Sequence, residues 1–162
     1  MFRWDELTVR DDLQQYVGRR HAHPQSVGVF DETSFVKKGN KTACVQRQHC
    51  GAVGKVENCV VSVHLGYATP EFYSLIDGEL FLPEKTWQHD RRRCRQAGIP
   101  DEVVYRPKWQ IALDQYRQAL ANGLRFAWLT FDEGYGGKGP FLRELERLGQ
   151  NYVAEVPASF PA

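Results

Sequence analysis

The stretch SVGVFDETSFVKKG, residues Ser26–Gly39, combines β-branched and aromatic residues in period-two alternation with a polar end that closes on glycine. This pattern predicts a strand that runs out into a loop. Alternation places Asp31 on the same side as Val27 and Val29, and Phe30 on the other side. A carboxylate that shares a face with valines is costly to desolvate unless a cation pairs with it. We therefore expect a divalent metal ion or a Lys or Arg side chain beside Asp31.

A second stretch further along the chain, LRFAWLTFDEGYG at residues 124–136, has the same character. Its apolar run is typical of a strand covered on both faces, and it ends at Asp132 before a glycine-rich loop. Two strands of one sheet that each deliver an aspartate near an end can bring Asp31 and Asp132 within a few ångströms. Such a pair favours Mg²⁺ or Mn²⁺, which prefer oxygen ligands. Glu32 and Glu133 follow the two aspartates, and alternation turns them to the opposite face.

The composition predicts one ordinary globular domain. The chain has 162 residues, of which 42% are hydrophobic, enough to fill one core, and its 25% charged residues argue against disorder. A net charge of +1 does not indicate a general polyanion binder. The four cysteines lack zinc-site spacing and a secretory signal, so we expect free thiols in the cytoplasm. No apolar run approaches the length needed to span a bilayer, and we expect no membrane contact.

Residues 1–24 are expected to form an N-terminal helix and a linker, the remnant of an upstream region. Thr8 and Asp11 have the spacing of a helix cap. One helical face, expected to be the packed one, carries Leu7, Leu13, Tyr16 and Val17.

Residues 25–162 are expected to form the main domain. Periodicity and turn signals predict strands at 42–48 and 58–67, a hairpin at 72–82 turning at Asp77-Gly78, helices at 109–120 and 140–148, and a final strand at 151–156. The polar, basic and proline-containing stretch 83–108 is expected to be a long excursion from the core. Three antiparallel strands followed by helix-crossover strands predict an α/β mixed sheet of the ribonuclease-H-like type.

Several spaced blocks carry a family resemblance. They are FDETSFVKKG at 30–39, RQHCG at 47–51, GKVENC at 54–59, LFLP at 80–83 and DEGYG at 132–136. With these blocks the chain resembles the catalytic domain of bacterial insertion-sequence transposases of the DDE superfamily endonuclease type. The resemblance covers residues 27–157, which is most of the chain.

The resemblance implies metal-dependent DNA cleavage and strand transfer in transposition. In such enzymes two aspartates and a glutamate hold two Mg²⁺ or Mn²⁺ ions, which activate water or a DNA 3′ hydroxyl for attack on a phosphodiester. Asp31 matches the first acid and Asp132 the second, so both are expected to be catalytic metal ligands. The implied partners are the DNA of transposon ends and target, at the nucleoid, and the chain is compatible with a homo-oligomer in a synaptic complex.

The third acid of the family is expected on a helix after the strand at 151–156. The chain ends at Ala162, so we expect a C-terminally truncated fragment that is inactive by itself. Glu155 lies within the predicted strand and is not assigned as the third acid.

Basic residues gather in two runs that are expected to contact DNA phosphates. They are Lys37, Lys38 and Lys41 in the first run and Arg91, Arg92 and Arg93 in the second. Solvated loops are the alternative interpretation of both runs.

Two other functional interpretations stay open. The glycine-rich segment at 134–139 follows a strand, as a phosphate-binding loop does, but Asp132 stands where a Walker A loop requires glycine and Gly139 stands where it requires Ser or Thr. The other interpretation is a module that keeps the fold and binds nucleic acid or protein without catalysis, or an inert remnant, because the last acid is absent.

Overall fold

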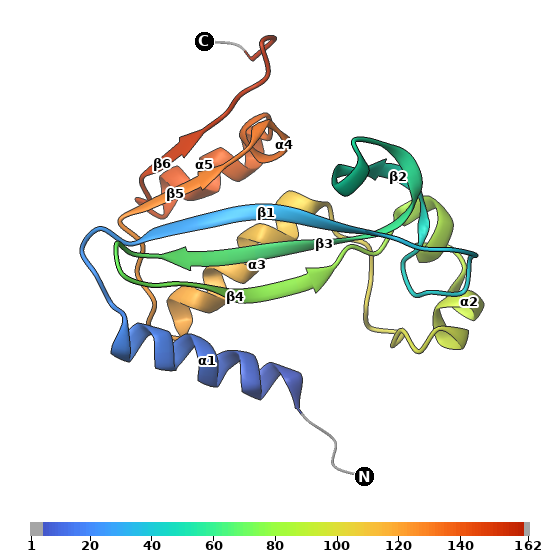
Figure 1. The fold of residues 1–162 in the computed structure, drawn as a ribbon, viewed down its shortest axis with the longest axis horizontal. Helices are drawn as coiled ribbons and strands as arrows, with labels where there is room; N and C mark the ends of the chain where they lie inside the picture. Colours follow the sequence, from blue (N-terminus) through green and yellow to red (C-terminus); the bar gives the residue numbers. More distant parts are fainter. Residues whose placement is uncertain (1–4, 161–162) are drawn as a thin grey trace. The chain divides into compact units, whose positions relative to one another are not determined.

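The computed structural model describes residues 5–160 (Figure 1). In chain order, the elements are α1 (Glu6–Arg20), β1 (Val27–Val36), β2 (Gln46–Cys50), the short helix η1 (Gly51–Val53), β3 (Lys55–Ala68), β4 (Tyr73–Leu80), the π-helical turn η2 (Glu84–Gln88), α2 (Arg91–Gln96), α3 (Lys108–Ala121), β5 (Trp128–Phe131), α4 (Glu133–Gly136), α5 (Gly139–Arg147) and β6 (Tyr152–Ala154). The expected mixed α/β class is confirmed. Among the described residues no helix is both long and apolar enough to cross a bilayer.

Six strands pair into one mixed sheet. Their order is β2-β3-β1-β5-β6, and β4 pairs with β3. β2 runs antiparallel to β3, whereas β1 with β5 and β5 with β6 are parallel pairs. Figure 1 shows β3 and β4 pointing in opposite directions, and the Thr69 N–H donates to the Phe72 carbonyl at 2.7 Å in their connection. The parallel strands follow helices α3 and α5, as crossover connections require.

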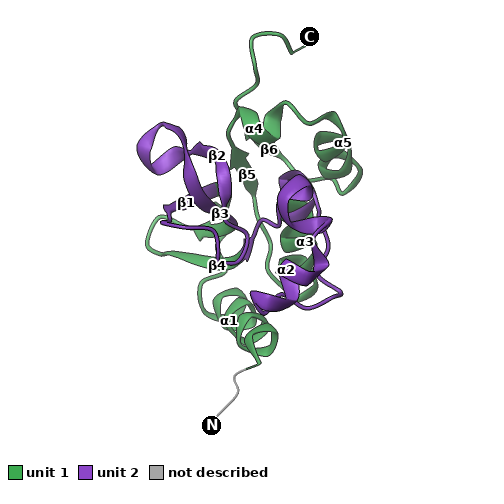
Figure 2. Ribbon diagram, turned by 90° about the vertical axis from the view of Figure 1, so that its right-hand side faces the viewer, with its two compact units in different colours: residues 1–31, 64–78, 112–162 green, residues 32–63, 79–111 purple. Residues whose placement is uncertain are grey.

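The chain divides into two compact units (Figure 2). Unit 1 contains the described residues up to Asp31, together with His64–Gly78 and those from Ala112 onward, and unit 2 contains Glu32–Val63 and Glu79–Ile111. The long strands β1, β3 and β4 contribute residues to both units. The boundary expected at residue 24 stays a prediction, and α1 belongs to unit 1.

The core of unit 1 contains an aromatic cluster from β1, β5, α4 and α5. Phe131 lies 5.1 Å from Phe141 between ring centroids, and Phe30 lies 5.9 Å from Phe141. Tyr135 packs 6.2 Å from Phe30 and is also buried. These rings fix β1 and β5 against the helices that follow β5.

Unit 2 has a core of its own, which corrects the interpretation of residues 83–108. Trp87 and Cys94 from that stretch are fully buried, and they pack with Val45 and Val60. The Trp87 Nε1–H donates to the Val45 carbonyl at 2.8 Å. The stretch 83–108, expected to lie outside the core, therefore contributes residues to it. The prediction failed because the few apolar residues of this stretch are too widely spaced to produce a periodic signal.

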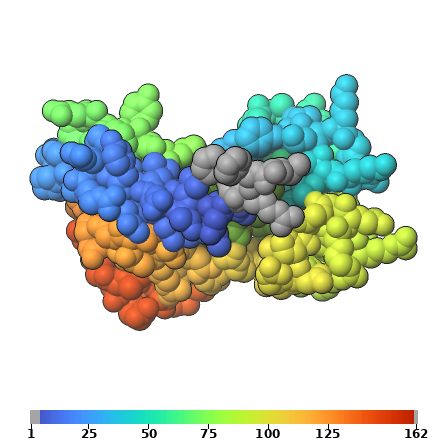
Figure 3. Space-filling model, turned by 90° about the horizontal axis from the view of Figure 1, so that it is seen from below, coloured from blue at the N-terminus to red at the C-terminus, as the bar shows by residue number. Residues whose placement is uncertain are grey.

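The packed face of α1 was predicted wrongly. The buried residues of α1 are Val17 and Gln14, whereas Leu7, Leu13 and Tyr16 are exposed. Figure 3 shows the outer surface of this helix in blue. Gln14 is tolerated inside because its Nε2 donates to the Ile76 carbonyl at 3.1 Å and its Oε1 accepts from Asn122 at 2.8 Å.

The cap of α1 was also predicted wrongly. The N-cap is Asp5, whose Oδ1 accepts from the N–H groups of Leu7 and Thr8. Residues 1–4 of the expected helix lie outside the described residues.

The expected hairpin at Asp77-Gly78 is wrong, since both residues lie inside β4. A Cβ added at Gly78 would lie 2.7 Å from Nδ1 of His64. Glycine is needed there for close side-chain packing against β3, so a dipeptide that favours turns stands in the middle of a strand. The strand expected at 42–48 starts later, at Gln46, because Cys44 adopts a positive φ of 65° that an extended strand does not accept.

The prediction of free thiols is confirmed, since all four cysteines are free and buried. Burial raises the pKa of the Cys44 thiol to about 11, which keeps it protonated and unreactive at neutral pH.

Candidate functional site

Asp31 lies near the middle of β1, on the face of the strand that is open to solvent. Burial alternates along β1, with Gly28 and Phe30 buried and Val29 and Asp31 exposed. Alternation therefore placed Asp31 and Val29 on one face of β1 and Phe30 on the other correctly. The expectation that the face with Asp31 is buried is wrong. Val29 itself is 37% exposed. Asp31 therefore lies on the solvent-exposed side of β1.

The register of β1 and β5 brings the two predicted aspartates to the same level of the sheet. The parallel register pairs Val27 with Trp128, Gly28 with Leu129 and Val29 with Thr130. One further step puts Phe30 beside Phe131, whose ring centroids are 6.5 Å apart. The next step puts Asp31 beside Asp132.

A register continued for two residues beyond Val29 and Thr130 would direct the two carboxylates to the same face of the sheet. The backbone of Asp132 is still extended, with φ −77° and ψ −178°, and both aspartates are exposed. Neighbouring strands lie about 4.8 Å apart, and residues opposite one another point to the same side. From the extended register we infer that Asp31 and Asp132 are neighbours on adjacent parallel strands.

The turn after β5 fixes the direction of the Asp132 side chain. Asp132 is the N-cap of α4, and its Oδ1 accepts from the Gly134 N–H at 2.9 Å. Its carbonyl accepts from the N–H of Gly136 at 2.8 Å. Because Oδ1 serves the cap, Oδ2 is the oxygen of Asp132 that can be offered to a cation.

Close backbone contact explains one glycine of the loop after Asp132. A Cβ on Gly136 would lie 1.9 Å from the carbonyl oxygen of Glu155. The N–H of Glu155 in turn donates to the Phe131 carbonyl at 3.1 Å, so this part of the loop packs directly against the end of β6. The steric need accounts for Gly136 without a bound phosphate.

Glu155 continues the same row of residues across the sheet. Phe131 pairs with Ala154, so the next step of this parallel register puts Asp132 beside Glu155, which is exposed. Among residues 5–160, however, no three His, Cys, Asp or Glu side chains are placed to hold a metal ion together. The candidate acidic site in this part of the chain is therefore limited to the predicted pair, Asp31 and Asp132. Two carboxylates with solvent access suit the oxygen preference of Mg²⁺, which keeps several waters when bound to proteins.

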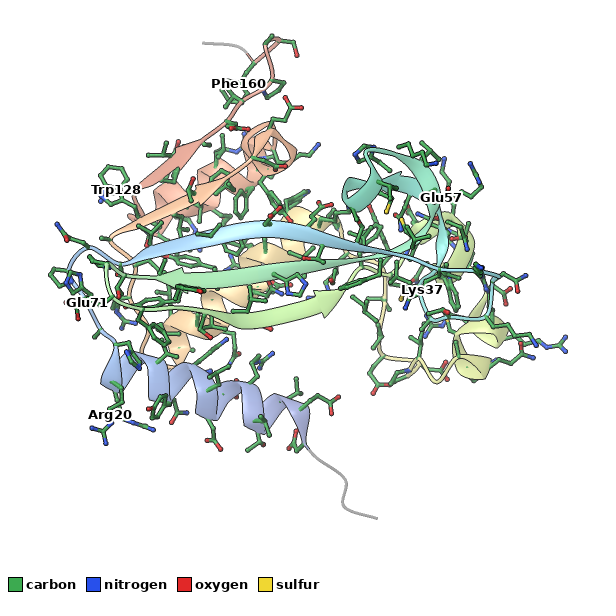
Figure 4. All side chains as sticks on the ribbon, in the orientation of Figure 1. Arg20, Lys37, Glu57, Glu71, Trp128 and Phe160 are labelled. Atoms are coloured by element: carbon green, nitrogen blue, oxygen red, sulfur yellow. The ribbon has the colours of Figure 1, made fainter. Side chains whose placement is uncertain are left out.

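The six predicted DNA-contacting residues all belong to unit 2, and the structure gives them different surroundings. The guanidinium of Arg91 donates to the carbonyls of Pro100, Asp101 and Val103, all at 3.0 Å, and thereby fastens a loop of its own unit. Lys37, at the end of β1, is half-buried, and Lys38 is exposed (Figure 4).

The other three basic residues line one cavity. Lys41, Arg92 and Arg93 are brought together there from two segments far apart in sequence. No pattern in the sequence indicated this cavity, because it is lined by the buried Trp87, whose burial periodicity did not predict.

Comparison with known proteins agrees with the resemblance. The family model described as DDE superfamily endonuclease matches residues 2–162. The protein described as probable transposase for insertion sequence element IS701, from Microchaete diplosiphon, is 33% identical over 129 residues, which are 79% of this chain and 31% of that protein. The chain thus spans about a third of the length of this curated relative. With the family model covering nearly every residue, the chain belongs to the DDE superfamily endonuclease family.

Proposed function

We propose that this chain is part of a transposase in which Asp31 and Asp132 bind a divalent cation, Mg²⁺ or Mn²⁺, for cleavage and strand transfer of DNA. The observation that carries the proposal is the parallel register of β1 and β5. Continued by two residues, this register would bring Asp31 and Asp132, both exposed to solvent, to one level of the sheet. When bound, the cation would supply charge neutralisation at the scissile phosphate and a more acidic water.

The protein's own contribution is to hold the two carboxylates in position. Phe30 and Phe131 directly precede the two aspartates and pack into the aromatic cluster on the other face of the sheet. The Gly134 N–H holds one oxygen of Asp132. These contacts fix the site before a ligand arrives, so less conformational entropy is lost on binding.

DNA is the proposed partner, and a second copy of the chain in a complex of two transposon ends belongs to the same proposal, as does location at the nucleoid. An alternative function is a nucleic-acid-binding module or inert remnant without catalysis. Among residues 5–160 no three His, Cys, Asp or Glu side chains are placed to hold one metal ion, and this favours that alternative.

Metal binding is tested with Mn²⁺ titrated into the wild-type chain and into Asp31→Asn and Asp132→Asn, followed by electron paramagnetic resonance. Loss of one anionic ligand should weaken binding by roughly tenfold or more, since the site has few charged ligands. Asp12→Asn is a matched control because Asp12 is an exposed acid on α1, in the same unit. Equal Mn²⁺ affinity in all four proteins would refute the assignment.

Catalysis is tested separately by nicking of a DNA end in Mn²⁺. Nicking by the wild type that is lost in Asp31→Asn supports the nuclease assignment, and nicking that survives the substitution rejects it. Metal binding without nicking in any protein favours the non-catalytic alternative.

A further inference from the structure

Unit 2 contains a cavity of about 570 Å³ that the proposed metal site does not use. It is lined by α2, by the segment before α2 and by the loop that follows β1. Its volume is in the range of pockets that bind small organic ligands or parts of larger ones. The polar residues that line it are Asn40, Lys41, Asp90, Arg92, Arg93 and Gln96.

Positive charge predominates in this cavity. Lys41, Arg92 and Arg93 contribute three cations, against one carboxylate from Asp90. Asp90 is already engaged, because its Oδ1 accepts from the Arg93 N–H at 2.9 Å as the N-cap of α2. Within residues 5–160 the side chains of Lys41 and Arg92 form no ion pair or hydrogen bond, and both residues are exposed. The cavity therefore presents two cations that are available to an anion.

Arg93 forms a rigid positive wall of the same cavity. Its two Nη atoms donate to the carbonyls of Thr86 at 2.9 Å and Asn40 at 2.8 Å. Its guanidinium carbon lies 3.8 Å from the centroid of the Trp87 ring, which is fully buried. Held from two segments and by the indole face, Arg93 keeps its charge in place without a ligand.

We propose that this cavity binds a phosphate group of a DNA strand, with Lys41 and Arg92 as the contacting cations and Arg93 as the fixed positive wall. The inference rests on the proposed function, because that function makes DNA the partner. Lysine supplies a compact charge and arginine a planar fork, and both bind phosphate oxygens well. The amides of Asn40 and Gln96 at the same cavity can donate to and accept from the adjoining sugar or base.

Neighbouring basic residues that were all expected to contact DNA phosphates have different surroundings in the structure. Lys41 and Arg92 line the cavity with side chains that are unengaged within residues 5–160, and Arg93 lines it with a guanidinium held by main-chain carbonyls, whereas Arg91 does not line the cavity and fastens a loop. Replacement of Arg91 should therefore act mainly on stability and replacement of Arg92 on binding.

The test is fluorescence anisotropy of a labelled single-stranded oligonucleotide with the 162-residue chain, measured in EDTA at several salt concentrations. The variants are Lys41→Gln and Arg92→Gln. Arg95→Gln is the matched control, because Arg95 is an exposed arginine of the same helix α2 that pairs with Asp101 at 3.2 Å and does not line the cavity. Thermal melting followed by circular dichroism verifies that all variants are folded.

Each cavity variant should bind the oligonucleotide roughly three- to tenfold more weakly, and its dependence of log affinity on log salt should be shallower by about 0.7, the value per phosphate contact of a single strand. Arg95→Gln should stay within about twofold of the wild type. Cavity variants that match Arg95→Gln in affinity and salt slope would overturn the proposal.

A calorimetric titration with inorganic phosphate and with a mononucleotide distinguishes the sources of the phosphate. Binding of these small anions that depends on Lys41 and Arg92, with oligonucleotide binding unchanged in the variants, would assign the cavity to a free phosphate and overturn its role with DNA. The binding test contains no divalent metal ion and no cleavage step. Failure of the Asp31 and Asp132 experiments therefore leaves its result intact, and a negative result here leaves the metal site untouched.

Discussion

Replacement of Gly136 by alanine tests the contact that joins the loop after Asp132 to the end of β6. The added Cβ would lie 1.9 Å from the carbonyl oxygen of Glu155, whereas a carbon and a carbonyl oxygen in contact need roughly 3.3 Å. The two backbone segments must therefore separate by about 1.4 Å. A shift of that size cannot be absorbed by side-chain rotation, because the obstructing atom belongs to the main chain.

The magnitude follows from the contacts that the shift would break. The Glu155 N–H to Phe131 carbonyl bond of 3.1 Å and the Gly136 N–H to Asp132 carbonyl bond of 2.8 Å both lie at this contact. Loss of one or two such bonds costs about 1 kcal/mol each, and overpacking strain adds roughly 1–3 kcal/mol. The lower entropy of the unfolded alanine chain offsets up to about 1 kcal/mol. Together these terms give a net loss of about 1–5 kcal/mol, centred near 3 kcal/mol, in the free energy of unfolding.

Urea unfolding followed by far-ultraviolet circular dichroism measures this loss. Gly18→Ala in α1 is the control, because its Cβ would meet only ordinary contacts, with the nearest atom at 3.6 Å, and the substitution should stabilise the helix by roughly 0.5–1 kcal/mol. Midpoints that rise equally in both variants would refute the steric argument. In Mn²⁺ titrations Gly136→Ala should also bind more weakly, since the shift moves the main chain that orients the Asp132 carboxylate.

Two further predictions concern other parts of the chain. Trp87→Phe should lower the free energy of unfolding by about 2–3 kcal/mol, because it leaves the buried Val45 carbonyl without its donor and opens a void under Arg93; a urea midpoint within error of the wild type would contradict it. The hydrogen bond from Asn122 holds the pKa of Asp11 below its ordinary value of 3.8. The ionised Asp11 carboxylate therefore stabilises the folded state fully above about pH 5, and this stabilisation is lost as the pH falls through the lowered pKa of Asp11 in the folded state. Asp11→Asn should therefore reduce the melting temperature more at pH 7 than at pH 3, and an equal reduction at both would contradict the linkage.

Local patterns were sufficient to predict the elements whose packing follows a simple period. The helix expected at 109–120 corresponds to α3, and the apolar run before Asp132 contains β5. Alternation along β1 separated Phe30 from Asp31 correctly, because a strand with one covered face repeats every two residues. Asp31 and Asp132 were proposed as ligands for a similar reason, since each interrupts an otherwise apolar or alternating run, and that assignment stays a prediction.

The failures involve residues whose role depends on partners distant in sequence. Gln14 is buried because a carbonyl of β4 and the amide of Asn122 satisfy its side chain, and nothing near Gln14 in the sequence indicates this. Gly78 lies inside a strand, where glycine is required because the His64 side chain of the neighbouring strand occupies the space that a Cβ at position 78 would need. Trp87 is a single indole in a polar stretch, and its burial depends on Val45. Propensity gives the wrong result where such tertiary contacts decide the structure.

The position of the acidic pair is determined by apolar residues that never contact a ligand. A Cβ on Gly28 would lie 2.5 Å from Cδ2 of Leu129, so the Leu129 side chain occupies the space that the glycine leaves. This fit favours the register in which Gly28 pairs with Leu129. A slip of one residue would turn every side chain of the strand to the opposite face, and would bury Asp31 where Phe30 now packs. The slipped register is excluded because it buries a carboxylate and exposes an aromatic ring, each at a cost of several kcal/mol. A packed core would therefore also maintain the proposed alignment of Asp31 with Asp132. If the proposed metal site is correct, substitutions at Gly28 or Leu129 should weaken Mn²⁺ binding in the same titration, although both residues belong to the apolar contact between the strands.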